Sequence, residues 1–131
     1  TNYLYELMNS NYIPVIAPLG YDQNNNVYNI NADSAASSIA SHLSAEKLIF
    51  LTDQQGVLNE KEELISSLDF NEINKLIDKG TITGGMLPKI KACLDAIEKN
   101  VKTAHIVDGR IQHSVLLEIF TNEGIGTLVK K

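Results

Sequence analysis

One stretch of the sequence combines a glycine pair, the start of a helical pattern and a lysine. In "TGGMLPKI", residues 83–90, two glycines precede an apolar helical repeat, and Lys89 falls about one turn inside it. Glycines at a helix start expose backbone N–H groups, and the positive end of the helix dipole adds to their attraction for an anion such as phosphate. The alternative is a plain tight turn at Gly84 and Gly85 with Lys89 extended into solvent, because this spacing differs from that of a P-loop.

A second stretch, "YNINADSAA" at residues 28–36, places three short polar side chains where an extended run becomes a helix. Asn29 and Asn31 lie on the same side of an extended segment, because side chains alternate along a strand. Asp33 then falls in the first helical turn, where the dipole favours a carboxylate. Capping by Asn31 explains two of the three residues and leaves Asn29 without a role.

A third polar pair, Thr52 and Asp53, ends the apolar run "KLIFLT". A strand that leads into a ligand site often ends in polar residues, but Thr-Asp also begins an ordinary turn. The pair is therefore a weaker indication of chemistry than Lys89 or Asp33.

The composition excludes several classes of function. The 131 residues carry 16 acidic and 11 basic side chains, a net charge of −5, and the basic residues are scattered, so we expect no nucleic-acid partner. No apolar run approaches the roughly 20 residues that span a bilayer, so we expect no membrane partner and a cytoplasmic location.

The residues that commonly bind metals are few and scattered. Cys93 is the only cysteine, which excludes an internal disulfide and a cysteine-rich zinc site. We expect Cys93 to be a small buried residue on a helix face. His42, His105 and His113 have no mutual spacing typical of a metal site, so we expect surface or packing roles and no metal ligands from side chains.

The elements that hold these residues can be predicted from the hydrophobic pattern. The small-residue helix that starts at Ala32 should turn its alanines inward and Ser34, Ser37, Ser41 and His42 mostly outward. The expected helices are at 3–8, 32–43, 69–80 (with capping-box spacing of Asp69 and Glu72), within 81–100 (with Pro88 in the first turn) and 113–120, and the expected strands are at 13–18, 20–30 (a hairpin), 47–52, 104–109 and 125–129.

This alternation of apolar strands and helices predicts an α/β fold. Parallel strands need crossover helices and are buried on both faces, so we expect a three-layer α/β/α arrangement around an open, mostly parallel sheet. No repeat or linker divides residues 1–131, which we expect to form one domain. Ligands bind outside the carboxyl ends of such strands, which points to the loops "NINAD", "TDQQGVL" and "TGGM".

Several motifs in order identify a family resemblance. The series "YIPVIAPLG … YNINAD … KLIFLTDQQGVL … GTITGGMLPKI … HIVDGRIQHSVLLEIFTNEGIGT" resembles, nearly end to end, the carboxy-terminal half of acetylglutamate kinases, a branch of the amino-acid kinase family. The other branches, aspartokinase, uridylate kinase, glutamate 5-kinase and carbamate kinase, are the alternatives. The acetylglutamate branch is favoured by the motifs "NINAD", "GGMLPKI", "DGR" and "EGIGT".

The resemblance implies transfer of the γ-phosphate of ATP to the side-chain carboxylate of N-acetyl-L-glutamate, which gives an acyl phosphate for arginine biosynthesis. A carboxylate nucleophile is already ionised at neutral pH, so Asp33 is not needed as a base. The reaction needs positive charge, from lysines, backbone N–H groups and Mg²⁺ held mainly by the nucleotide phosphates. By resemblance, Lys89 stabilises the phosphoryl group, Asp33 holds Lys89 and a second lysine that is missing here, and Asn29 holds the amino-acid substrate. The implied nucleotide contacts are Thr52, Asp53, Gly56, Val57, Leu58, Thr81, Thr83, Gly85 and Met86.

The tail "FTNEGIGT" resembles that of family members inhibited by arginine, with Glu123 and Gly124 at the effector. A carboxylate suits a guanidinium by bidentate hydrogen bonding. The alternative is a turn that Gly124 and Gly126 permit before the last strand.

The resemblance covers only one half of the family's length. The amino-terminal half, with a glycine-rich phosphate-binding stretch, its own lysine and most of the amino-acid site, has no counterpart in residues 1–131, and the chain opens directly into a helix pattern. We therefore expect a portion of a larger, homo-oligomeric enzyme that binds nucleotide weakly and does not turn over alone. The alternative is a non-catalytic module that senses nucleotide or effector.

Overall fold

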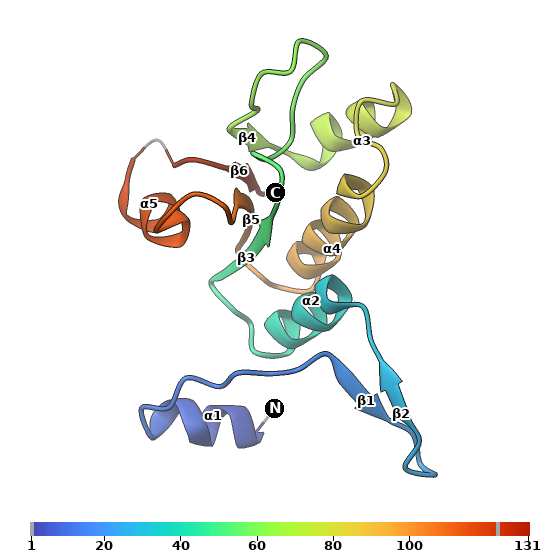
Figure 1. Cartoon of the computed structure of the whole chain (residues 1–131), viewed down its shortest axis with the longest axis vertical. Helices are drawn as coiled ribbons and strands as arrows, with labels where there is room; N and C mark the ends of the chain where they lie inside the picture. The colour runs from blue at the N-terminus through green and yellow to red at the C-terminus, as the bar shows by residue number, and fades with distance from the viewer. Residues whose placement is uncertain (1, 123) are drawn as a thin grey trace.

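The computed structural model describes residues 2–122 and 124–131, shown in Figure 1. Its helices are α1 (Asn2–Asn9), α2 (Ala32–His42), α3 (Phe70–Asp78), α4 (Met86–Glu98) and α5 (Ser114–Phe120). Its strands are β1 (Leu19–Tyr21), β2 (Val27–Asn29), β3 (Lys47–Thr52), β4 (Ser67–Leu68), β5 (Thr103–Asp108) and β6 (Thr127–Val129).

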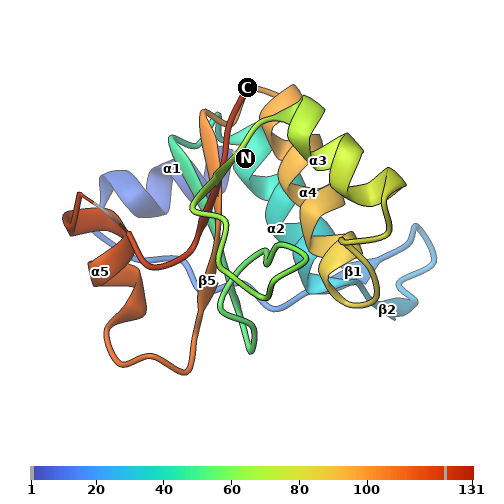
Figure 2. The same ribbon diagram turned by 90° about the horizontal axis from the view of Figure 1, so that it is seen from above.

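A four-stranded sheet in the order β3-β5-β6-β4 forms the centre of the molecule. β3 and β5 run parallel over six residue pairs, from Lys47 opposite Thr103 to Thr52 opposite Asp108. β4 also runs parallel to β6, whereas β5 and β6 are antiparallel. Figure 2 shows α2, α3 and α4 on one side of this sheet and α5 on the other. The predicted three-layer, mostly parallel α/β fold is confirmed.

The main core lies between the sheet and α4. Ile90, Cys93 and Ile97 of α4 are fully buried and belong to the same cluster as Phe50 of β3 and Ile106 of β5. Burial, with a smaller contribution from the negative charge of Asp33, raises the pKa of the Cys93 thiol to about 12. Cys93 is thus the inert packing residue that the sequence predicted.

The predicted capping box is present at the start of α3. The Asp69 side chain accepts a hydrogen bond from the Glu72 N–H at 2.8 Å, and the Glu72 side chain accepts one from the Asp69 N–H at 2.9 Å. Two N–H groups that a helix start leaves without partners are satisfied in this way. Gly80, with φ at +73°, follows the end of the helix as expected.

The predicted strand at 13–18 is wrong. The segment is irregular, and it passes beside α2 in Figure 1 without pairing to any described strand. Ile13 and Val15 are 90% and 95% exposed, although their pattern is that of a strand buried on both faces. A strand needs a neighbour to receive its backbone hydrogen bonds, and this run has one only at its end, where the Pro18 carbonyl accepts a hydrogen bond from the Ile30 N–H at 2.8 Å.

The prediction that Ser37 faces outward is also wrong. Ser37 is 1% exposed, and its hydroxyl donates to Asp95 of α4 at 3.2 Å. The small residues of α2 bring that helix close to α4, so the side between the two helices is as buried as the side toward the sheet. Ser34 and His42 are exposed, as predicted.

β4 was not predicted, because its two residues are too few to show a period. Ser67 and Leu68 pair with Leu128 and Val129 of β6, so β4 lies at the edge of the sheet opposite β3.

Candidate functional site

Lys89 and Asp33 form the centre of the site. Asp33 lies in the first turn of α2, Lys89 lies one turn inside α4, and these two helix starts meet although 56 residues separate the pair in sequence. The Lys89 Nζ donates to both carboxylate oxygens of Asp33, at 3.1 and 3.0 Å. Their side chains are only 21% and 20% exposed. The alternative in which Lys89 extends freely into solvent is excluded.

The aromatic ring of Phe50 also lies near the ammonium group. Its centroid lies 6.0 Å from the Lys89 Nζ, within the range of a cation–π contact. Because Asp33 and Phe50 both fix this amine, it is held in one place rather than free to move with a flexible side chain.

A cavity of about 520 Å³ opens beside Lys89, between the end of β3 and the start of α4. Its volume is typical of a site for a small molecule. The structure brings together around this cavity all nine residues that the resemblance implied as nucleotide contacts, together with Lys89, Gln54 and Ile82: Thr52, Asp53, Gly56, Val57, Leu58, Thr81, Thr83, Gly85 and Met86.

The start of α4 offers backbone donors to this cavity. Gly84 has φ at +54°, and Gly85 is the N-cap residue of a helix that has no side-chain cap. No atom lies within 4 Å of the positions where side chains would begin at these two glycines, so the backbone is open to a guest. The N–H groups of Met86 and Leu87 donate to the Thr83 and Gly84 carbonyls at 3.3 Å, and Pro88 has no N–H. The N–H groups of Gly84 and Gly85 and the helix dipole are therefore what favours an anion at this place.

The two asparagines of "NINAD" have different surroundings in the structure. The Asn31 side chain caps α2 by accepting a hydrogen bond from the Ser34 N–H at 3.0 Å, which confirms the capping prediction. Asn29 ends β2, pairs with Leu19 in the hairpin, is exposed and does not line the cavity. The described residues thus give Asn29 no partner that explains it.

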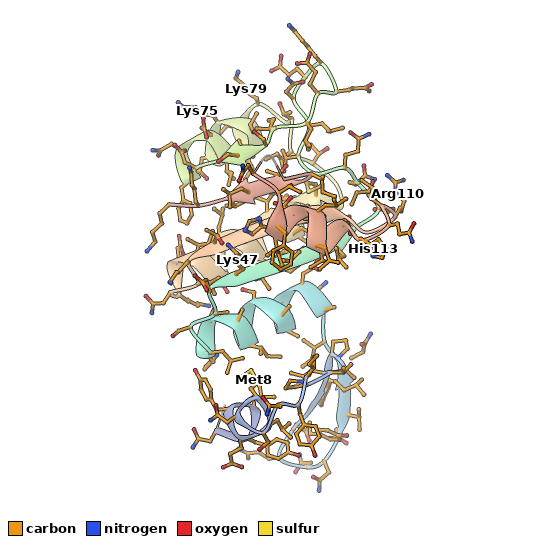
Figure 3. All side chains as sticks on the ribbon, turned by 90° about the vertical axis from the view of Figure 1, so that its left-hand side faces the viewer. Met8, Lys47, Lys75, Lys79, Arg110 and His113 are labelled. Atoms are coloured by element: carbon orange, nitrogen blue, oxygen red, sulfur yellow. The ribbon has the colours of Figure 1, made fainter. Side chains whose placement is uncertain are left out.

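Sequence reasoning assigned no role to Asp108 and Arg110 at the end of β5. The Arg110 Nε and Nη2 donate to the two oxygens of Asp108 at 2.9 and 2.8 Å, and the Arg110 N–H donates as well. These hydrogen bonds lower the pKa of Asp108 to about 2. Asp108 lies across from Thr52 in the pairing of β5 with β3, so the Asp108–Arg110 ion pair lies at the same end of the sheet as the cavity. In Figure 3, Arg110 and His113 lie toward one end of the sheet and Lys47, the first residue of β3, lies toward the other. The sequence did not show that β3 and β5 are neighbours, so it could not show that Asp108 lies near Thr52.

The tail is fixed by a carboxylate that the sequence did not single out. Glu118 of α5 accepts hydrogen bonds from His105 Nδ1 at 2.7 Å and from the N–H groups of Ile125 and Gly126 at 2.7 and 3.0 Å. Burial opposes ionisation of Glu118, but these hydrogen bonds outweigh burial and leave its pKa below the ordinary value. His105 is buried against α5, which agrees with the packing role predicted for it.

The predicted effector residues are only partly described. Glu123 lies outside the described residues. Gly124 has φ at +63°, which fits the alternative of a turn before β6.

Within residues 2–122 and 124–131, histidine, cysteine, aspartate and glutamate nowhere gather in a group of three that could hold a metal ion. Over the same residues, each helix is too short or too polar to cross a bilayer.

Comparison with known proteins identifies relatives along nearly the whole chain. The sequence profile of the amino acid kinase family matches residues 1–108. Acetylglutamate kinases from Persephonella marina and Aquifex aeolicus are 57% and 56% identical over 97% and 95% of this chain. The chain covers 42% of each of those proteins, so it spans about two-fifths of their length.

Solved structures give the same picture of the fold. N-acetylglutamate synthase from Neisseria gonorrhoeae, solved with coenzyme A and L-arginine, matches 99% of this chain and 30% of its own, with a TM-score of 0.93 and 29% identity. Carbamate kinase from Giardia matches with a TM-score of 0.74 at 23% identity over 99% of this chain and 47% of its own, which supports the fold alone.

Proposed function

The chain belongs to the amino acid kinase family, and from that premise we propose that it forms the nucleotide-binding part of an acetylglutamate kinase. The proposed reaction transfers the γ-phosphate of ATP to the side-chain carboxylate of N-acetyl-L-glutamate. The observation that carries the proposal is the position of Lys89, which lines the cavity while Asp33 holds its ammonium group.

The chemistry of the reaction suits this arrangement. The acceptor is a carboxylate, which needs no base, so Asp33 acts by aiming Lys89 and not by taking a proton. Charge on the transferring phosphoryl group is stabilised by Lys89 and by the N–H groups of Gly84 and Gly85 just before α4. Lys89 and Gly85, the N-cap residue of the same helix, both line the cavity.

ATP is the cofactor that this proposal requires, together with Mg²⁺. The residues lining the cavity include one carboxylate, Asp53, which fits an ion held mainly by the nucleotide phosphates rather than by a protein cage. Such an ion would neutralise phosphate charge during transfer.

The proposal assigns only part of an active site to these residues. One lysine reaches the cavity, whereas phosphoryl transfer usually draws on several positive groups. We therefore expect residues 1–131 alone to bind ATP weakly and not to phosphorylate acetylglutamate. Asn29 is assigned to the amino-acid substrate, and Glu123 and Gly124 to an arginine effector. The arginine assignment is supported by the tail sequence and by the arginine complex of the Neisseria relative.

The test compares Lys89→Ala with Lys91→Ala in the full-length gene product. Lys91 is an exposed lysine on the same helix that does not line the cavity, so it controls for loss of a charge. We expect Lys89→Ala to lower kcat for acetylglutamate by about 10²- to 10³-fold, as for loss of a major electrostatic contact, and Lys91→Ala to leave it near wild type.

Two further measurements complete the test. Aspartate, glutamate, carbamate and UMP are offered as acceptors, and preference for any of them would move the protein to another branch of the family. Binding of ATP without phosphorylation of any acceptor would instead identify a nucleotide-sensing module.

A further inference from the structure

The hydroxyl of Thr127 is a buried polar group that the proposed reaction does not use. Thr127 begins β6 and is 0% exposed. Its two hydrogen-bond partners are both backbone groups, the Val57 N–H and the Ile65 carbonyl, and Val57 lines the cavity. A buried hydroxyl costs free energy unless it is paired, so these two hydrogen bonds define its place in the fold.

The two partners are the ends of one loop. The Val57 N–H donates to Thr127 Oγ1 at 2.8 Å, and Thr127 Oγ1 donates to the Ile65 carbonyl at 2.7 Å. The Ile65 N–H in turn donates to the Val57 carbonyl at 2.8 Å. Two hydrogen bonds therefore join Thr127 to both ends of the 57–65 loop, and a third joins those two ends to each other.

The entrance of this loop lies against the same side chain. Gly56 has φ at +146°, and a Cβ atom there would lie 2.7 Å from Thr127 Oγ1 and from Leu64 Cδ1. Gly56, Val57 and Leu58 all line the cavity. A shift of Thr127 would thus move the wall of the cavity, because no spare space separates the two.

The tail itself is fixed from the other side. Gly126 packs so closely on the carbonyl of Ile106 in β5 that it has no room for a side chain. Glu118 receives the Ile125 and Gly126 N–H groups. Thr127 is therefore held between a rigid strand and the cavity loop.

We infer that Thr127 is a positioning residue for nucleotide binding: its hydroxyl sets the position of the Gly56–Val57 backbone that forms one wall of the cavity. The inference rests on the proposed function, since it takes the ligand of this cavity to be ATP. It adds a residue that lies outside the cavity and acts on it through the backbone.

The experiment uses Thr127→Val, Thr127→Ser and Val129→Ala in the full-length gene product. Thr127→Val keeps the shape and removes the hydroxyl, whereas Thr127→Ser keeps the hydroxyl. Val129 is a fully buried residue of the same strand with no hydrogen bond from its side chain, so Val129→Ala controls for loss of stability. Affinity for the Mg²⁺ complex of a non-hydrolysable ATP analogue is measured by calorimetry, with Tm and both KM values alongside.

We expect Thr127→Val, which removes both hydrogen bonds of the hydroxyl, to weaken nucleotide binding by about tenfold and to leave the KM for acetylglutamate unchanged. Thr127→Ser should restore most of the affinity, and Val129→Ala should lower Tm without weakening nucleotide binding. Equal affinity of Thr127→Val and wild type, or an equal loss in Val129→Ala, would overturn the inference. No binding of the analogue by wild type would overturn the proposed function itself.

A second measurement needs no variant. In wild type, the nucleotide analogue should slow hydrogen exchange of the Val57 amide and of residues 125–129, because the ligand fixes the wall that Thr127 holds. Slowing confined to the start of α4, with Val57 unchanged, would contradict the inference even if Thr127→Val failed to fold.

Discussion

The Lys89–Asp33 pair should be coupled more strongly than an ordinary surface ion pair. We consider Asp33→Asn, Lys89→Met and the double variant, which together form a double-mutant cycle on the free energy of unfolding. Asp33→Asn leaves the Lys89 ammonium group without its carboxylate, and Lys89→Met leaves the Asp33 carboxylate without its ammonium group. Both side chains are about four-fifths buried. The double variant removes both charges, so the cycle isolates the interaction between them.

The magnitude follows from geometry and exposure. Exposed ion pairs contribute about 0.2 to 1 kcal/mol, and removing one partner of a fully buried pair costs about 3 to 5 kcal/mol. Lys89 Nζ contacts both carboxylate oxygens at 3.0 and 3.1 Å, and the two side chains are about one-fifth exposed. Solvent screening at that exposure reduces the interaction, so we expect a coupling free energy of about 1 to 2 kcal/mol.

Urea unfolding at neutral pH measures this coupling. With a slope of about 1 to 3 kcal/mol per molar urea, a change of this size moves the midpoint by roughly 0.3 to 2 M. The matched control is the same cycle on Lys102 and Glu46, a pair at 3.4 Å whose side chains are 72% and 74% exposed, which should couple less. If the Lys89–Asp33 coupling did not exceed that of the control, the argument that a buried acid aims the lysine would fail.

Two further predictions concern the sheet and its end. Gly126→Ala should lower the free energy of unfolding by about 1 to 3 kcal/mol, because its Cβ would collide with the Ile106 carbonyl. Gly85→Ala, where the backbone is open, should change it little, and equal thermal shifts in the two variants would contradict this account. The hydrogen-bonded Asp108 has a pKa of about 2, below its ordinary 3.8, so its contribution to stability is present above pH 4 and is lost as the pH falls toward 2. Arg110→Gln should flatten the fall in stability between those pH values, as followed by acid titration of circular dichroism; an unchanged slope would show that Arg110 is not the cause.

The sequence predicted most of the elements because their signals are local. Periodicity, the capping box at Asp69 and the glycines at 84 and 85 depend on residues a few positions apart, so the chain carries them without reference to its fold. The predicted strand at 13–18 shows the limit of this reasoning. Its apolar residues have the expected pattern, but a strand exists only beside another strand.

The sequence by itself determined which residue types stand at helix starts and strand ends, and hence that a lysine, a carboxylate and glycine N–H groups are available. The family resemblance implied that Asp33 holds Lys89, but residue types and spacing did not show which groups meet, and only the tertiary structure decided that. Lys89 reaches Asp33 across 56 residues, and Thr127 reaches Val57 across 70. Such contacts follow from strand order and helix packing, which sum many weak interactions over the whole chain, so no short window of sequence contains them.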